Sequence, residues 1–152
     1  MCLDLHNNPT STKGIETKGN FFVGYKALVI SPWGTDAWEV TSMNYSCFSW
    51  GLLNKKRSKF TLSKDAKQLK ESSRETTSLS HVEELYGVNF GFHFYVKEKD
   101  AIKDNPNDSL IVECLIPKDC FVAQGTFLYK SFVSTKTKIN RIVKLPTGLE
   151  EE

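Results

Sequence analysis

The stretch YGVNFGFHFYVKEKDA, residues 86–101, decides the class of fold that this chain adopts. From residue 88 to residue 96 its large apolar side chains recur at every second position, which places them on one face of a β-strand. The apolar face would carry Val88, Phe90, Phe92, Phe94 and Val96, and the opposite face Asn89, Gly91, His93 and Tyr95. Apolar residues that alternate in this way are typical of a strand with one buried face. The stretch therefore predicts a strand that packs its phenylalanines into a core.

Six further segments have the composition of strands, because β-branched and aromatic residues in them are bounded by Gly, Pro, Asn and Ser. They are residues 21–30, 38–43, 45–53, 109–116, 121–129 and 132–143. Three segments have helical character, residues 62–69, 80–87 and 97–104. This content predicts an α+β fold: a mostly antiparallel twisted sheet of six or seven strands with two or three short helices. Residues 109–116 are apolar enough for a central strand, in which Glu113 is the one interior charge.

The chain has 152 residues, a length that fits one domain. Residues 1–20 are polar and predict a flexible N-terminal arm, residues 21–145 predict a single domain, and residues 146–152 predict a tail. Residues 54–78 hold eight Lys and Arg against three Asp and Glu, with only a thin apolar stripe. We interpret them as a basic insertion of helix and loop.

Two tryptophans, Trp33 and Trp38, fall in a segment, residues 31–38, that follows a Ser-Pro turn signal and is predicted to be a loop. Aromatic side chains on a loop either cover the core beneath it or contact a partner. We expect these two to cover the core, with contact as the alternative.

The formal net charge of +2 gives the molecule no global field that would recruit nucleic acid. No apolar run approaches the roughly 18 residues of a membrane span, and the N-terminus does not resemble a signal peptide. Both features favour an intracellular protein. The four cysteines are scattered, and the nearest pair, Cys114 and Cys120, does not have the spacing of a zinc knuckle. We therefore expect reduced thiols, no metal site and no cofactor.

Four segments, GYKAL (24–28), GFHFY (91–95), ECLIPKDCFVAQGTF (113–127) and STKTKINRIV (134–143), together with the MCL start, resemble a group of small uncharacterised proteins encoded mainly by bacteriophages. The resemblance covers about a third of the chain, in the same order, and each motif is short. It implies a phage setting and the cytoplasm of a host cell. It implies no established activity, so no catalytic residue is transferred.

A looser likeness concerns chemistry. The strand GFHFY, a helix containing Ala101 and the strand LIVECLI resemble the layout of the ADP-ribosyltransferases. That family brings a His or Arg on its first strand, where this chain reads GYKAL, and a late glutamate, which STKTKINRIV does not contain. Glu113 lies on a different strand from the one that would carry this glutamate. The sequence also contains no Walker loop, nucleophile elbow or dinucleotide fingerprint, which disfavours an enzyme without excluding one.

His93 is the residue of this sheet whose pKa suits acid–base work, and with Tyr25 and Tyr95 it could form a ligand-binding surface. The plainer interpretation is a histidine packed beside Tyr95 under the helix at residues 80–87. We favour packing.

The basic segment offers a second candidate site, for binding of a partner: Lys55, Lys56, Arg57, Lys59 and Phe60, together with Trp33. These charges could be solvated only, could dock on an acidic protein surface, or could contact phosphates. Nucleic acid is disfavoured because aromatics are not interleaved through the run. The sequence thus predicts a phage-encoded, non-catalytic accessory protein that binds and modulates a host protein, with a defence system as the expected target. The alternative is a domain that binds a small ligand or nucleotide, with an ADP-ribosyltransferase-like domain as one form of it.

Overall fold

The computed structural model describes residues 4–5, 11–35, 37–42, 49–56, 59–62, 70–71 and 92–147. The strands among them are β1 (Asp4–Leu5), β2 (Thr17–Lys18), β3 (Phe21–Trp33), β4 (Ala37–Ser42), β5 (Ser49–Lys56), β6 (Lys59–Leu62), β7 (Lys70–Glu71), β8 (Phe92–Tyr95), β9 (Leu110–Pro117), β10 (Val122–Phe127), β11 (Tyr129–Ser134) and β12 (Lys136–Lys144). The described residues contain one helix, α2 (Glu98–Lys103).

The fold is mostly β, which corrects the predicted α+β class with two or three helices. One of the predicted helices, at residues 97–104, is present as α2. The helix at residues 80–87 lies outside the described residues. Of the helix predicted at 62–69, only Leu62 is described, and it belongs to β6. There it pairs with Leu53 of β5, as Phe60 of β6 pairs with Lys55. No helix in the part of the chain described here is long and apolar enough to cross a membrane.

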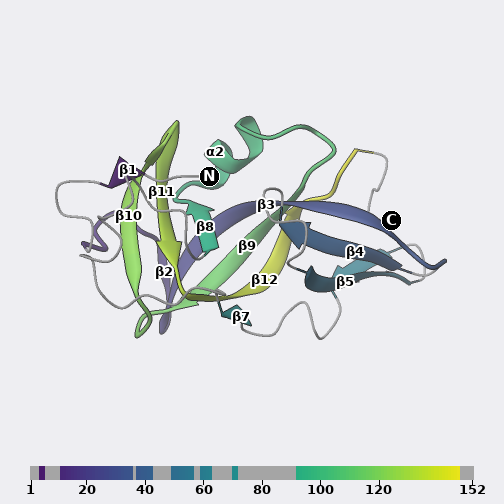
Figure 1. Ribbon diagram of the computed structural model, residues 1–152, viewed down its shortest axis with the longest axis horizontal. Helices are drawn as coiled ribbons and strands as arrows, with labels where there is room; N and C mark the ends of the chain where they lie inside the picture. Colours follow the sequence, from purple (N-terminus) through teal and green to yellow (C-terminus); the bar gives the residue numbers. More distant parts are fainter. Residues whose placement is uncertain are drawn as a thin grey trace.

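The longest strand, β3, organises the sheet (Figure 1). The first half of β3 pairs with β9 along one edge. Along its other edge, from the N-terminal to the C-terminal end of β3, it pairs first with β2, then with β8 and then with β4. Beyond β8 the sheet continues through β11 and β10 to β1, and beyond β4 through β5 to β6. All of these pairs are antiparallel. Figure 1 shows β10 and β11 at one end of the molecule and β4 and β5 at the other, with β3 running between them.

The alternation of β3, β8 and β9 sorts their side chains into two cores. The larger core contains Phe92 and Phe94 of β8, as predicted, and extends to Trp50 of β5 and Phe132 of β11. The smaller core lies on the opposite face, where α2 covers the sheet and its Ala101 is fully buried. The predicted residues Val88 and Phe90 lie outside the described part of the chain.

A glycine allows the aromatic centre of the larger core to form. Phe94 and Phe132 stack with their ring centroids 5.1 Å apart, over Gly24 of β3. A Cβ atom at position 24 would lie 2.7 Å from Phe132 Cζ and 2.8 Å from Phe94 Cβ. The strand therefore needs glycine here, because the two rings occupy the space of a side chain.

Two strand boundaries differ from the prediction. β3 continues through Ser31 and Pro32 to Trp33, which pairs with Ala37 of β4, so residues 31–33 and 37–38 are paired in a hairpin and do not form the predicted loop. The closing strand predicted at 132–143 is instead two strands that separate at Thr135, since β11 pairs with β10 and β8 whereas β12 pairs with β9. A turn signal in the sequence did not break β3, because Pro32 can occupy a strand position whose N–H is not needed by the ladder.

Parts of the predicted arm and insertion take part in the sheet. Within residues 11–20, Ile15 is buried and β2 pairs with β3. Within residues 54–78, the described residues belong to β5, β6 and β7, and the rest lies outside the description.

Candidate functional site

Four side chains from four neighbouring strands lie opposite one another across the sheet. Arg141 of β12 is paired with Glu113 of β9, Glu113 with Tyr25 of β3, and Tyr25 with Tyr95 of β8. Directly opposed residues of antiparallel strands project from the same face. The sheet register thus forms a polar row on the face that α2 partly covers, and two of its members, Tyr25 and Tyr95, are predicted site residues.

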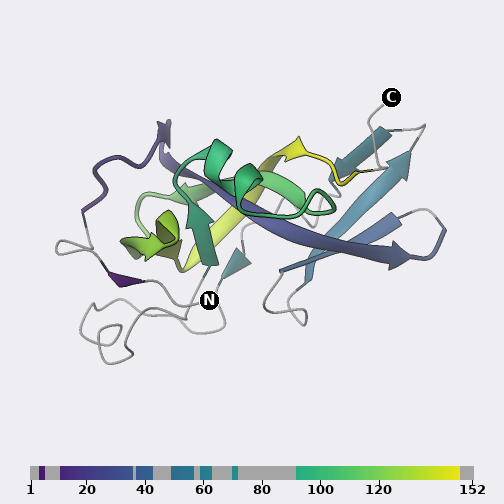
Figure 2. The same ribbon diagram turned by 90° about the horizontal axis from the view of Figure 1, so that it is seen from above.

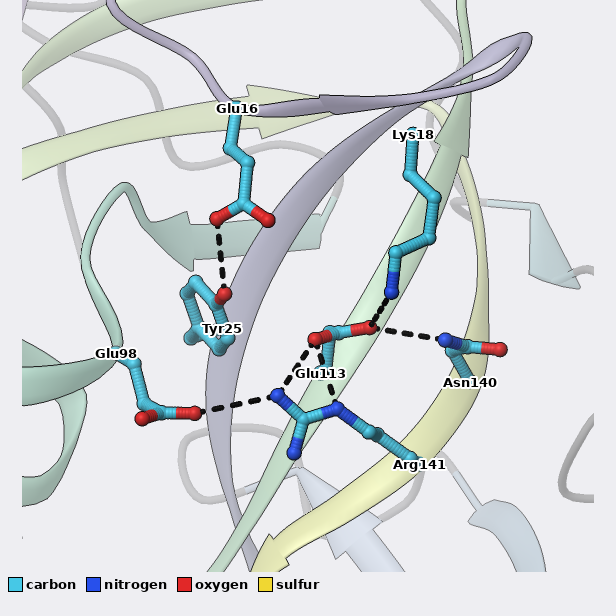
Figure 3. Close-up of polar contacts among 7 residues, drawn as sticks. All are labelled: Glu16, Lys18, Tyr25, Glu98, Glu113, Asn140 and Arg141. Atoms are coloured by element: carbon cyan, nitrogen blue, oxygen red, sulfur yellow. Dashed lines mark hydrogen bonds and ion pairs between the residues drawn. The ribbon is translucent and has the colours of Figure 1, made fainter.

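Glu113 is the centre of this row, and its side chain is only 2% exposed (Figure 3). Its Oε1 accepts hydrogen bonds from Lys18 Nζ at 3.2 Å and Asn140 Nδ2 at 2.9 Å. Its Oε2 accepts from Arg141 Nε at 2.9 Å and lies 2.8 Å from Arg141 Nη2. A buried carboxylate is tolerated only when it is paired and hydrogen-bonded, and both oxygens of Glu113 meet that condition.

A β-bulge delivers two of these donors. The β12–β9 register shifts between Ile139 and Arg141, so Asn140 is an extra residue in β12. A bulge bends the strand and changes the direction of its side chains. As a result, Asn140 and Arg141, although adjacent in sequence, both reach Glu113.

Burial and hydrogen bonding act on the pKa of Glu113 in opposite directions. Burial raises the pKa, but the hydrogen bonds from Asn140 and Lys18 and the charges of Arg141 and Lys18 outweigh it, so the pKa lies below its usual value. Burial lowers the pKa of Arg141, and the charge and hydrogen bond of Glu113 reverse that effect and raise it. The pair is therefore held in its ionised form.

A surface pocket of about 530 Å³ opens beside Tyr25. Its walls come from residues 14–16, from Tyr25 and from residues 96–99 at the start of α2. The Tyr25 hydroxyl donates to Glu16 Oε1 at 3.0 Å, and Glu98 accepts from Arg141 Nη2 at 3.4 Å (Figure 3). Burial, followed by the hydrogen bond and the charge of Glu16, raises the pKa of Tyr25, so its hydroxyl stays protonated at neutral pH.

Tyr95, unlike Tyr25, does not line this pocket. Its ring is buried, and its hydroxyl donates to Asp104 Oδ2 at 2.5 Å and accepts from Asn105 Nδ2 at 3.2 Å. Asn105 also donates to the carbonyl oxygen of Ala101 at 2.7 Å. Tyr95 therefore fastens the C-terminal end of α2 to the sheet, while the Arg141–Glu98 contact joins its first residue to the row.

His93 lies on the same face as Tyr95 and is partly buried. Its ladder partner is Val133 of β11, and its carbonyl oxygen accepts a hydrogen bond from Lys26 Nζ at 2.9 Å. It does not line the pocket beside Tyr25. The ligand surface predicted from Tyr25, His93 and Tyr95 is thus one sheet face, but only Tyr25 borders the pocket.

The predicted partner-binding residues lie at the far end of the sheet. Trp33 ends β3 and is 55% exposed, so it does not cover the core as expected; Trp38, by contrast, is partly buried and packs against the larger core. Lys55, Lys56, Lys59 and Phe60 belong to the β5–β6 hairpin, and Arg57 lies outside the described residues.

Sequence reasoning missed the contacts of Glu113. Its partners come from positions 18, 140 and 141, and Glu98 extends the network through Arg141. Glu16 bonds Tyr25, the neighbour of Glu113 in the row. One signal was present: a lone charge in a buried strand requires a partner. Among the described residues no group of three or more His, Cys, Asp or Glu could hold a metal ion.

Comparison of the chain with family models, with curated proteins and with solved structures found no match.

Proposed function

We propose that this chain is a phage-encoded accessory protein that binds a host protein and modulates it without catalysing a reaction, with a component of host defence as the target. The proposal starts from the resemblance of its GYKAL, GFHFY and IPK segments to small phage proteins. The observation that carries it is the exposure of Trp33, which is 55% exposed at the end of β3. Tryptophan is among the residues that contribute most to protein–protein binding energy, and burying one on a partner removes a large apolar area from water.

The polar row, which lies away from Trp33, fits a structural role because its polar groups are already hydrogen-bonded. Glu113 is saturated by Lys18, Asn140 and Arg141, and the Tyr95 hydroxyl is engaged beneath α2. Groups in this state hold strands and helix together, and a reaction at either would first have to break these contacts. The row thus fits a scaffold role rather than a reactive site.

Affinity capture tests the proposal. The tagged full chain is expressed in host cells before and during infection, and proteins that co-purify in stoichiometric amounts are identified. Addition of the purified chain to the purified host protein should then change that protein's activity. Capture of no host protein at either stage, or capture without any effect on activity, would rule the proposal out.

A second candidate function is binding of a small ligand or nucleotide, which the pocket beside Tyr25 favours. Nucleotides, including NAD and ADP-ribose, should then raise the melting temperature of the wild-type chain, and Glu16→Gln at the pocket wall should reduce that rise. The matched control is Glu39→Gln, outside the pocket. No rise with any nucleotide would count against this function.

A further inference from the structure

The pocket beside Tyr25 lies between two segments that are each held against the sheet. On one side Ile15 is buried, and the carbonyl oxygen of Glu16 accepts a hydrogen bond from the N–H of Val23 at 2.8 Å. On the other side α2 packs through Ala101 on the first half of β3, and Figure 2 shows the helix lying over that strand. The walls are therefore fixed by the fold, and the pocket is preformed. Its volume of about 530 Å³ lies within the range of small-molecule sites.

The wall of the pocket is apolar where it is buried and charged where it reaches the surface. Ile15 and Val96, which are 6% and 8% exposed, supply aliphatic side chains, and the buried Tyr25 supplies an aromatic ring. Glu16 and Glu98 supply carboxylates, and in the view of Figure 3 the Tyr25 ring lies between them. The pocket thus offers a hydrocarbon surface bordered by two carboxylates.

Glu16 is the carboxylate of this wall whose charge is not neutralised within the described part of the chain. Glu98 lies 3.4 Å from Arg141 Nη2 and shares its charge. Glu16 makes no ion pair with another described residue, and its hydrogen bond is the one that it accepts from the Tyr25 hydroxyl at 3.0 Å. A carboxylate beside apolar surface attracts a cation more strongly than one surrounded by water, because the effective dielectric is lower. Glu16 therefore provides a counter-charge for a positively charged ligand.

The electrostatic environment of the Tyr25 hydroxyl supports this sign of charge. Burial is the largest cause that raises the pKa of Tyr25, followed by the hydrogen bond to Glu16 and by the charges of three carboxylates, Glu16 and Glu98 among them. Each of these charges is negative. Two lysines also border the pocket, Lys97 and Lys99, but both are exposed to water, which screens their charges. The floor of the pocket thus favours a cation over an anion.

We propose that this pocket binds a small alkylammonium ion, a free amine whose hydrocarbon chain lies against Ile15 and Val96 and whose ammonium group pairs with Glu16. The inference rests on the second candidate function, ligand binding by this pocket, and gives the ligand a chemical class. An ammonium group donates charge-assisted hydrogen bonds to a carboxylate, whereas the phosphates of a nucleotide would be repelled by it. A metal ion fits less well, because the described residues contain no group of three or more metal-binding side chains.

The test titrates the full wild-type chain with pentylamine, pentanol and pentanoate, which share a chain length and differ in charge. Binding is followed through the amide NMR signals of residues 14–16 and 96–99, which line the pocket. Pentylamine should bind about tenfold more tightly than pentanol or better, because only its ammonium group forms a charge-assisted bond with Glu16. Pentanoate should not shift these signals. Added salt should weaken the binding of pentylamine, because it screens the exposed Glu16 carboxylate.

Two matched variants locate the counter-charge. Glu16→Gln removes the charge and keeps an oxygen that can accept from the Tyr25 hydroxyl, so the preference for pentylamine over pentanol should disappear. Glu39→Gln makes the same change on β4, away from the pocket, and should keep the preference. Melting curves without ligand check that both variants are folded. If Glu16→Gln does not fold, the three probes on the wild-type chain still decide the result.

The source of the ammonium group is distinguished by a second pair of probes, cadaverine and N-acetyl-lysine methylamide. Tighter binding of cadaverine supports a free amine. Tighter binding of the lysine derivative overturns the free amine in favour of a lysine side chain of another protein.

The remaining outcomes separate this site from the functions proposed above. Equal binding of pentylamine and pentanol, or tighter binding of pentanoate, overturns the ammonium site. Binding of ADP-ribose or NAD at the same amide signals, without binding of any amine, overturns it and leaves the second candidate function intact. Binding of none of these compounds overturns both. Capture of a host protein is independent of the result, because Trp33 does not line this pocket.

Discussion

Arg141 lies directly opposite Glu113 in the β12–β9 ladder, and its Nε and Nη2 atoms both approach the same carboxylate oxygen, at 2.9 and 2.8 Å. The bulge at Asn140 sets this arrangement. Arg141 is half exposed whereas Glu113 is buried, so the pair joins the interior of the sheet to its surface and, through Glu98, to α2. Five side chains, Lys18, Glu98, Glu113, Asn140 and Arg141, thereby link β2, β9 and β12 to the helix.

Glu113→Gln should lower the free energy of unfolding by about 2–4 kcal/mol, because it leaves Arg141 and Lys18 without their buried counter-charge. The control is Glu98→Gln, whose half-exposed contact with Arg141 is worth less than about 1 kcal/mol. Urea denaturation of both variants at pH 7 measures the difference. Equal losses in the two variants would mean that the network does not centre on Glu113.

Acid should remove the contribution of Glu113 to the free energy of unfolding. Because its pKa is lowered in the folded chain, the stability it supplies is fully present above the unfolded value of 4.5 and is lost as the pH falls through the folded value. The difference in unfolding free energy between wild type and Glu113→Gln should therefore narrow below pH 4.5. Denaturation curves at several pH values between neutrality and strong acid test this, and a difference that stays constant would show that the charge is not the cause.

Gly24→Ala should destabilise the chain by about 1–3 kcal/mol, since the added methyl group would overlap the rings of Phe94 and Phe132. Phe132→Leu should recover part of this loss when the two substitutions are combined, because it vacates the space near the new Cβ. The coupling free energy from this double-mutant cycle is the measurement. Strict additivity would contradict the close approach.

Lys26→Met should stabilise the chain more at pH 7 than at pH 10. Burial lowers the pKa of Lys26 to about 8, from 10.5 when unfolded, so the folded state binds this proton more weakly. The resulting loss of stability is complete below pH 8 and disappears as the pH rises to 10.5. Denaturation at the two pH values gives the comparison, and Lys99→Met on the exposed side of α2 controls for loss of a lysine.

Phe92→Ala should cost about 3–5 kcal/mol, because Phe92 is buried and its ring lies 5.2 Å from that of Trp50. The fluorescence of buried Trp50 should also change as its neighbour is removed. Val29→Ala, at a position 39% exposed, should shift stability by less than about 0.5 kcal/mol. An unchanged melting temperature for Phe92→Ala would remove this ring from the core.

Alternation within one strand was enough to predict the burial of Phe92 and Phe94 and the opposite facing of Tyr95, because the period of two is a property of the strand itself. The apolar run at 109–116 likewise identified β9 as a central strand. The predicted α+β class was wrong, because it depended on segments whose sequences have only a weak preference for helix. Leu62, the first residue of one predicted helix, instead pairs with Leu53 in the β5–β6 hairpin, because a neighbouring strand offers it ladder hydrogen bonds.

The polar row required tertiary structure. Lys18 and Glu113 are 95 positions apart, and Glu113 and Arg141 are 28 apart. Nothing local specifies which residue of one strand faces which residue of another, because register is set by packing of the whole sheet. The sequence by itself determined that Glu113 would be a charge within an apolar strand and that Trp33 would be an aromatic next to a turn. Pairing across β12, β9, β3 and β8 decided that the charge of Glu113 is neutralised inside the protein. The position of Trp33 at the end of the β3–β4 hairpin decided that its indole stays in contact with water.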